Sequence, residues 1–285
     1  MKSQGPVTKG MIFAGCSFTW GQGLYYYSNM PTLEEPPLNH FQVELVKDTH
    51  IEYMKLIRFP RFVANHFNTF ELCQPWNGGA SYSIHDWWRR CFMDKTDPEK
   101  NKGNHPAIPP TYNYEDISHI FYQFTQWPRA QSSTKLNRLH TTTHNDTMHN
   151  PVFGQWLTDN NLTLDRYIHQ AKEKEIQDAK NFLQTFIDHG IKVYVMCWPM
   201  DLTEYIEQDD WLRSRMIKFE YKGNDYPSIE HMMESNDEFG EVVNPELTIY
   251  WDIDEFEVTP QDMHPSRKCH RVIADNIIKH LEREI

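Results

Sequence analysis

A serine just beyond a short apolar run has the position that a nucleophile needs. Residues 11–14 (Met-Ile-Phe-Ala) have the composition of a buried strand, Gly15 ends the run, and Ser17 follows two residues later. Ligands of open parallel α/β sheets bind in the crevice at the carboxyl ends of the strands. A glycine there lets a substrate approach the backbone closely. Ser17 is therefore either a nucleophile in such a crevice or the N-cap of a helix that follows a buried strand.

An acid and a histidine stand close to the other end of the chain. Asp262 and His264 come just before Pro265, and proline suits the first turn of a helix because its missing N–H would be unpaired there. Apolar residues then recur at helical spacing from 272 to 281, which predicts a helix with one buried face. The start of this helix would hold His264 at a rim of the protein. A histidine at a rim is either a general base or an ordinary surface residue.

Together the two ends resemble the SGNH (GDSL-type) hydrolase family. Residues 15–19 (Gly-Cys-Ser-Phe-Thr) resemble its nucleophile block, and residues 262–265 (Asp-Met-His-Pro) resemble its final acid–histidine block. Residues 77–81 (Asn-Gly-Gly-Ala-Ser) are similar to its second block, and residues 123–126 (Gln-Phe-Thr-Gln) stand where the family usually carries Gly-x-Asn-Asp. The resemblance implies a flavodoxin-like three-layer α/β sandwich with a central parallel sheet of about five strands.

The resemblance also implies roles for individual residues. Ser17 would be the nucleophile, His264 its general base, and Asp262 the group that orients the imidazole. The oxyanion hole would use the backbone N–H groups of Ser17 and Gly79, with Thr125 as a further donor. Substrate contacts are expected from three further side chains: Gln123, Arg129 and Trp20. No metal and no cofactor are expected.

The chain departs from the family pattern at three positions. Cys16 stands where aspartate is usual, and Thr125 stands where the oxyanion-hole asparagine would be. Asp262 lies two residues before His264, whereas a spacing of three is commoner. The shorter spacing still lets the carboxylate meet the imidazole if a loop joins the two residues.

Composition limits the classes of partner. The chain has 285 residues, with 28 Lys and Arg against 40 Asp and Glu, so its net charge is −12. So acidic a chain is poorly suited to binding the phosphate backbone of DNA or RNA, and nucleic acid is not an expected partner. Aromatic residues make up 14%, including nine Trp. Such an excess lines carbohydrate-binding surfaces or fills a large aromatic core. Nothing in the sequence indicates the oligomeric state.

Five cysteines, an odd number without a Cys-x-x-Cys pair, predict free thiols in a reducing compartment. The first six residues lack the apolar core of a signal peptide, and no apolar window reaches the ~18 residues of a membrane span. We therefore expect cytoplasmic synthesis and no membrane span, with the final location left open.

Apolar periodicity predicts alternating strands and helices in a single domain over residues 1–285. Strands are expected at 11–14, 70–73, 117–124, 191–198 and 247–251, and helices over 51–67 (interrupted near Pro60), from Ser83 to Cys91, over 168–187 and after Pro265. This alternation is typical of one parallel α/β sheet. Large insertions are expected near 21–50, 94–114, 130–163 and 200–246, the last with lid-like helical pieces.

One insertion carries residues of the kinds that bind metals. These are His140, His144, Asp146 and His149. Their spacing matches no rigid metal site, so we interpret them as part of a polar loop.

Three functions remain open on these grounds. The first is a serine esterase that removes an acetyl or other small acyl group from a glycan or lipid through an acyl-enzyme. The second is an SGNH-like fold that has lost catalysis and acts as a structural or interaction module. The third is a nucleotide-binding flavodoxin-like protein, although Gly21-x-Gly23 is the only candidate for a phosphate-cradling loop.

Overall fold

The computed structural model describes residues 9–16, 19, 21, 24, 48–74, 81–93, 109–125, 151–237, 240–243, 246–254 and 257–284. Within these ranges, side chains are not described at 82, 151–153, 235–237, 240–243, 248–254 and 257–263.

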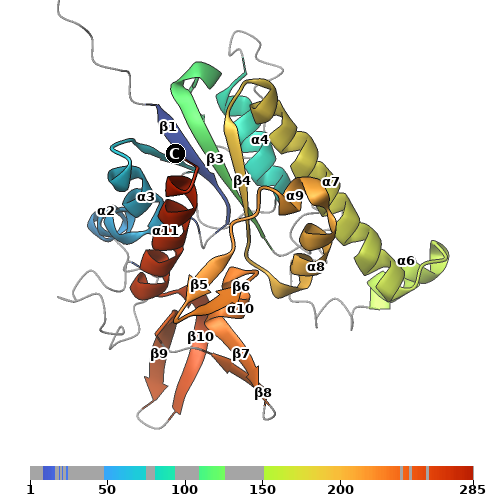
Figure 1. Ribbon diagram of the computed structural model, residues 1–285. Coiled ribbons are helices and arrows are strands. Elements are labelled where there is room, and N and C mark those ends of the chain that lie inside the picture. Colours follow the sequence, from blue (N-terminus) through green and yellow to red (C-terminus); the bar gives the residue numbers. More distant parts are fainter. Residues whose placement is uncertain are drawn as a thin grey trace, which may run out of the picture.

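A four-stranded parallel sheet forms the centre of the fold (Figure 1). Its strands are β1 (Gly10–Ala14), β2 (Glu71–Cys73), β3 (Ile117–Phe124) and β4 (Lys192–Cys197), in the spatial order β2-β1-β3-β4. Ile12 of β1 pairs with Leu72 on one side and Ile120 on the other. The predicted strands at 11–14, 70–73, 117–124 and 191–198 are thus confirmed to within a few residues.

Helices cover both faces of this sheet, as the apolar strands require. Along β1, Ile12 and Ala14 belong to the core that includes α4 (Ser81–Cys91) and α7 (Leu164–Asp188). Met11 and Phe13 point to the opposite core, which includes α3 (Phe59–His66) and α11 (Arg267–Glu282). Figure 1 shows the two groups of helices on either side of the strands. The molecule is therefore an α/β protein with a central parallel sheet, as predicted.

The remaining elements are shorter and lie mostly in the predicted insertions. They are α2 (Asp48–Ile57), η3 (Tyr114–Asp116), α6 (Pro151–Asp159), α8 (Met200–Gln208), α9 (Asp210–Arg213), β5 (Phe219–Tyr221), β6 (Asn224–Tyr226), α10 (Ile229–Met233), β7 (Glu234–Asp237), β8 (Gly240–Val243), β9 (Thr248–Asp254) and β10 (Glu257–Pro265). The 200–246 region thus combines the expected helical pieces with two small antiparallel hairpins, β5–β6 and β7–β8.

Several helices depart from their predicted bounds; α7, for example, begins at Leu164, four residues before the predicted start. The break between α2 and α3 falls at Arg58, and Pro60 lies inside the first turn of α3 rather than interrupting a helix. Proline is tolerated there because the first N–H groups of a helix have no intrahelical partner. Helix α4 begins at Ser81, two residues before Ser83.

The predicted fifth strand does not join the parallel sheet. Strand β9 pairs antiparallel with β10, the strand that contains Asp262 and His264. Only residues 255 and 256 separate the two strands. A parallel partner needs a crossover of about a dozen residues or more, whereas a two-residue connection suffices for a hairpin. The expectation that a loop joins Asp262 to His264 is therefore wrong, since both lie in β10.

A different segment lies beside the outer strand β4. Val195 donates its N–H to the carbonyl of Arg215 at 2.9 Å and accepts from the N–H of Ile217 at 2.9 Å, and Val195 forms a parallel bridge with Met216. This bridge lies on the side of β4 that faces away from β3.

All five cysteines are free thiols, four of them buried. Within the part of the chain that the structure describes, no helix combines the length and apolar character needed to cross a membrane.

Candidate functional site

The strand order predicts a crevice at the point where the sequence predicts a nucleophile. After β1 the chain forms β2 on one side of it, and later β3 on the other side. Helices that follow such strands leave in opposite directions over the two faces, which opens a crevice at the carboxyl ends of β1 and β3. Gly15 and Cys16 follow β1 directly, so the block that the sequence suggests as nucleophilic begins at this edge of the sheet.

Buried polar side chains converge on Gly15 from both neighbouring strands. From the end of β2, Gln74 donates a hydrogen bond from Nε2 to the carbonyl oxygen of Gly15. From β3, Gln123 accepts a hydrogen bond at Oε1 from the hydroxyl of Thr19, and the Sγ of Cys16 lies 4.0 Å from the same oxygen. The turn after β1 is therefore held by amide groups from both sides.

Glycine is required at position 15. A Cβ atom built on Gly15 would lie 2.6 Å from Gln123 Oε1 and 2.9 Å from Gln123 Cβ, and closer still to the Thr19 hydroxyl. Such separations are well inside van der Waals contact, so any side chain would push the turn away from β3.

Three polar atoms of this cluster have no hydrogen-bond partner among the described residues. They are Gln74 Oε1, Gln123 Nε2 and Thr125 Oγ1, and their side chains are at most 2% exposed. Nearly all buried polar groups in proteins are paired, and an unpaired one costs about 1–3 kcal/mol. A polar ligand or an ordered water could satisfy these three atoms, which lack a partner within the described part of the chain.

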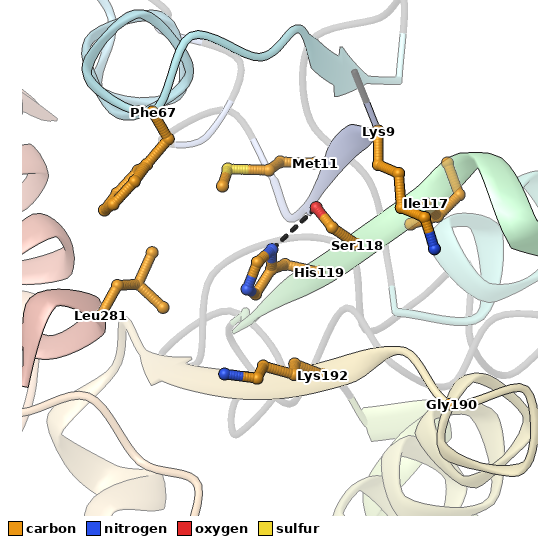
Figure 2. Close-up of a pocket in the computed structure, with 9 residues that line it drawn as sticks. All are labelled: Lys9, Met11, Phe67, Ile117, Ser118, His119, Gly190, Lys192 and Leu281. Carbon is orange, nitrogen blue, oxygen red and sulfur yellow. Dashed lines mark hydrogen bonds between the residues drawn. The ribbon is translucent and has the colours of Figure 1, made fainter. Parts of the chain in front are cut away.

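The direction of α11 brings His264 to the same edge of the sheet. Leu281, near the end of α11, lines a cavity together with Lys9, Ser118 and Lys192, which stand at the beginnings of their strands (Figure 2). A helix of 16 residues is about 24 Å long. The start of α11, and His264 just before it, therefore lie toward the carboxyl ends of the strands.

A series of contacts runs from the loop after β1 to α11, the helix that follows His264. The ideal Cβ position of Gly21 lies 3.3 Å from the Cβ of Arg58, which precedes α3. The next residue, Phe59, donates its N–H to Nδ1 of His270 at 3.2 Å. Burial, followed by the charges of Arg58 and His264, lowers the pKa of His270 to about 3. The loop after β1 therefore lies near the start of α3, and α3 packs against α11.

His270 itself is a neutral, fully buried ring. Because Nδ1 accepts from Phe59, its proton lies on Nε2, and this atom has no hydrogen-bond partner among the described residues. Neither His270 nor Gln74 was expected at the site. Gln74 could have been found as a polar residue directly after a predicted strand, whereas His270 carries no sequence signal beyond its place in a helix.

Several predicted site residues lie outside the described part of the chain. These are Ser17, Trp20, Gly79 and Arg129, together with the metal-type residues His140, His144, Asp146 and His149. Asp262 is described in its backbone only. Among the residues that are described, no cluster of three or more His, Cys, Asp or Glu side chains could hold a metal ion.

Comparison of the chain with protein-family models, with curated proteins and with solved structures found no match.

Proposed function

We propose that this protein is a serine hydrolase that cleaves an ester through an acyl-enzyme, with Ser17 as the nucleophile. The observation that carries the proposal is a set of three buried polar atoms around Gly15 that have no partner among the described residues, at the carboxyl ends of the strands of a parallel sheet. The flavodoxin-like fold that the sequence resemblance implies is compatible with the strand order β2-β1-β3-β4.

In this mechanism His264 removes the proton of Ser17, and Asp262 holds the imidazole in the required tautomer. The serine oxygen attacks the ester carbonyl, the alcohol leaves with a proton from His264, and water then cleaves the acyl-enzyme. The approach of β10 and α11 to the carboxyl edge of the sheet supports the role of His264.

Negative charge on the tetrahedral oxyanion needs preorganised donors. Backbone N–H groups of Ser17 and Gly79 would supply two of them. The buried Thr125 hydroxyl and the Nε2 of Gln123 have no other partner among the described residues and are available as further donors. They would take the place of the asparagine that the family usually carries near this position and that this chain lacks.

The proposed substrate is an O-acetyl or other small acyl ester on a glycan or lipid. Hydrolysis of aryl acetates, followed by acetylated polysaccharides, tests this activity. Ser17→Ala should lower kcat by about a million-fold. Asp262→Asn should lower it by about ten thousand-fold, because the histidine remains but in the wrong tautomer. Equal rates for the wild type and Ser17→Ala would exclude Ser17 from the mechanism.

One observation favours the alternative of a non-catalytic interaction module with the same fold. Gln74, Gln123 and Thr125 are almost completely buried, so the polar atoms that lack a partner among the described residues do not face open solvent. A protein that shows no esterase activity and no reaction with serine-directed probes would fit this alternative.

A further inference from the structure

A second hollow lies at the opposite edge of the parallel sheet, where the strands begin (Figure 2). Its volume is about 350 Å³, and its lining includes Lys9, Met11, Phe67, His119, Lys192 and Leu281. This volume falls within the range of roughly 300–1,000 Å³ that is typical of small-molecule sites. Because the hollow is at the amino ends of the strands, it is separate from the site around Gly15.

One wall of this hollow is apolar. Met11 from β1, Phe67 after α3 and Leu281 from α11 converge on it, as Figure 2 shows. Met11 and Leu281 belong to the core on this side of the sheet and are only 3% and 4% exposed. A ligand seated here would bury aliphatic carbon against side chains that packing already holds in place.

The polar lining is cationic. Lys9 and Lys192 both contribute to it, and none of the described lining residues is acidic, although the whole chain carries a net charge of −12. Lys192 Nζ lies 3.2 Å from Glu284 Oε2, and both side chains are substantially exposed. An exposed pair of this kind contributes little to stability, and an ammonium group has three donors, so Lys192 can also bind an anion.

His119 and Ser118 do not form a catalytic pair here. The Ser118 hydroxyl donates to the carbonyl of Gly10 at 3.1 Å, so at 2.8 Å from His119 it accepts the N–H of Nδ1. Burial, and to a smaller extent the charge of Lys192, lowers the pKa of His119 to about 4. The charge of Glu284 acts in the opposite direction and raises this pKa. At neutral pH His119 therefore adds a neutral ring to the hollow. The arrangement suits binding rather than catalysis.

We propose that this hollow binds a medium-chain aliphatic carboxylate. The chain would lie against Met11, Phe67 and Leu281, and the carboxylate would accept a hydrogen bond from Lys192. The combination of an apolar wall with a cationic rim selects a molecule that has both an aliphatic chain and a negative charge. This inference does not depend on the esterase proposal.

Calorimetry and NMR of the full-length protein with octanoate test the proposal. Octanoate should bind and should shift the resonances of Met11, His119 and Leu281. Octanol has the same tail without the charge, and acetate has the charge without the tail, so each should bind at least about tenfold more weakly. Equal affinity for octanol and octanoate would overturn the proposal, as would shifts confined to residues around Gly15.

Two matched variants separate the charge of Lys192 from its ion pair. Lys192→Met and Glu284→Gln both remove the ion pair, but only the first removes the cation. Lys192→Met should weaken octanoate binding about tenfold, whereas Glu284→Gln should leave it unchanged or strengthen it. Lys174→Met, which alters an exposed lysine on α7, should have no effect. Unchanged binding in Lys192→Met would contradict the proposed role of the lysine.

Discussion

Gly15 and its neighbours determine how closely the candidate nucleophile loop packs on the sheet. Two glutamines hold the loop, Gln74 through the carbonyl of Gly15 and Gln123 through the hydroxyl of Thr19. The space beside Gly15 is filled by Gln123 and Thr19, which leaves no room for a methyl group. A single added carbon therefore tests whether this packing matters.

Gly15→Ala should lower the free energy of unfolding by about 1–3 kcal/mol, the usual cost of overpacking, and should abolish esterase activity by moving the loop. Urea denaturation measures the first effect. Gly154→Ala is the matched control, because a Cβ at Gly154 in α6 meets nothing within 4 Å. It should raise stability by up to about 1 kcal/mol, since alanine is the better helix former. A neutral Gly15→Ala would contradict the packing described here.

A second residue-scale feature is the buried carboxyl group of Glu175 on α7. It accepts a hydrogen bond from the Ser81 hydroxyl at the start of α4 and is 2% exposed. Burial raises its pKa to about 7. A raised pKa means that the folded protein holds this proton more tightly than the unfolded chain does. Stability is therefore lost as the pH rises from about 4.5 to about 7.

Glu175→Gln should remove this penalty while keeping an acceptor for Ser81. At pH 8 the variant should be more stable than the wild type by up to about 3 kcal/mol, and near pH 4.5 the difference should disappear. Urea denaturation at both values measures this effect. Glu173→Gln, at an exposed neighbour on the same helix, should not change the pH dependence. A Glu175→Gln variant that is less stable at pH 8 would show that the buried carboxylate is stabilising.

At the scale of elements, the N-terminus of α11 fixes the strand that carries His264. Ser266 is the N-cap, and its hydroxyl accepts from the N–H of Cys269 at 3.1 Å and donates to the carbonyl of Glu246 at 2.7 Å. Its own N–H donates to the carbonyl of Leu247 at 2.8 Å. One side chain thus joins the start of the helix to the segment that leads into β9.

Ser266→Ala should lower the free energy of unfolding by about 1–2 kcal/mol, because both hydroxyl bonds are lost. Ser266→Thr keeps the hydroxyl and should retain most of the stability. Chemical denaturation of the three proteins provides the comparison. If the threonine variant were as unstable as the alanine variant, the loss would have to come from steric change rather than from the missing cap.

The elements that the sequence predicts well are those with strong periodicity. Strands β1, β3 and β4 are nearly continuous apolar runs, and α7 and α11 have long amphipathic patterns, so local composition agrees with the tertiary packing. Strand β9 also has strand character, but its partner depends on the length of the next connection, which apolar periodicity does not report. At the site, the sequence identifies Gly15, Gln123 and Thr125 because they lie at or just after the ends of predicted strands. His270 does not, because its role depends on a contact with Phe59 across 211 positions.

For the whole molecule, buried histidines make the fold sensitive to acid. Burial lowers the pKa of His85 to about 4 and, together with Arg58 and His264, that of His270 to about 3. A lowered pKa means that the unfolded chain binds the proton more tightly. The stability that depends on these neutral rings is present above pH 6.5 and is lost as the pH falls toward 4.

Glu175 acts in the opposite direction over the same range. Between pH 7 and pH 5 the histidines whose pKa values burial lowers, His119 included, should lower the stability of the wild type and of Glu175→Gln by the same amount. Protonation of Glu175 should restore roughly 2 kcal/mol of stability to the wild type alone. The wild type should therefore lose about 2 kcal/mol less stability than Glu175→Gln over this interval. Denaturation at pH 5 and pH 7 measures both values. Equal losses in the two proteins would contradict the opposing titrations.

The central claim is that Ser17 is a nucleophile activated by His264, and a fluorophosphonate probe tests it most directly. After labelling, mass spectrometry of the peptides should find the phosphonyl group on Ser17 in the wild type, no label in Ser17→Ala, and strongly slowed labelling in His264→Ala. A folded wild-type protein that remains unlabelled, or that is labelled at a serine other than Ser17, would contradict the account.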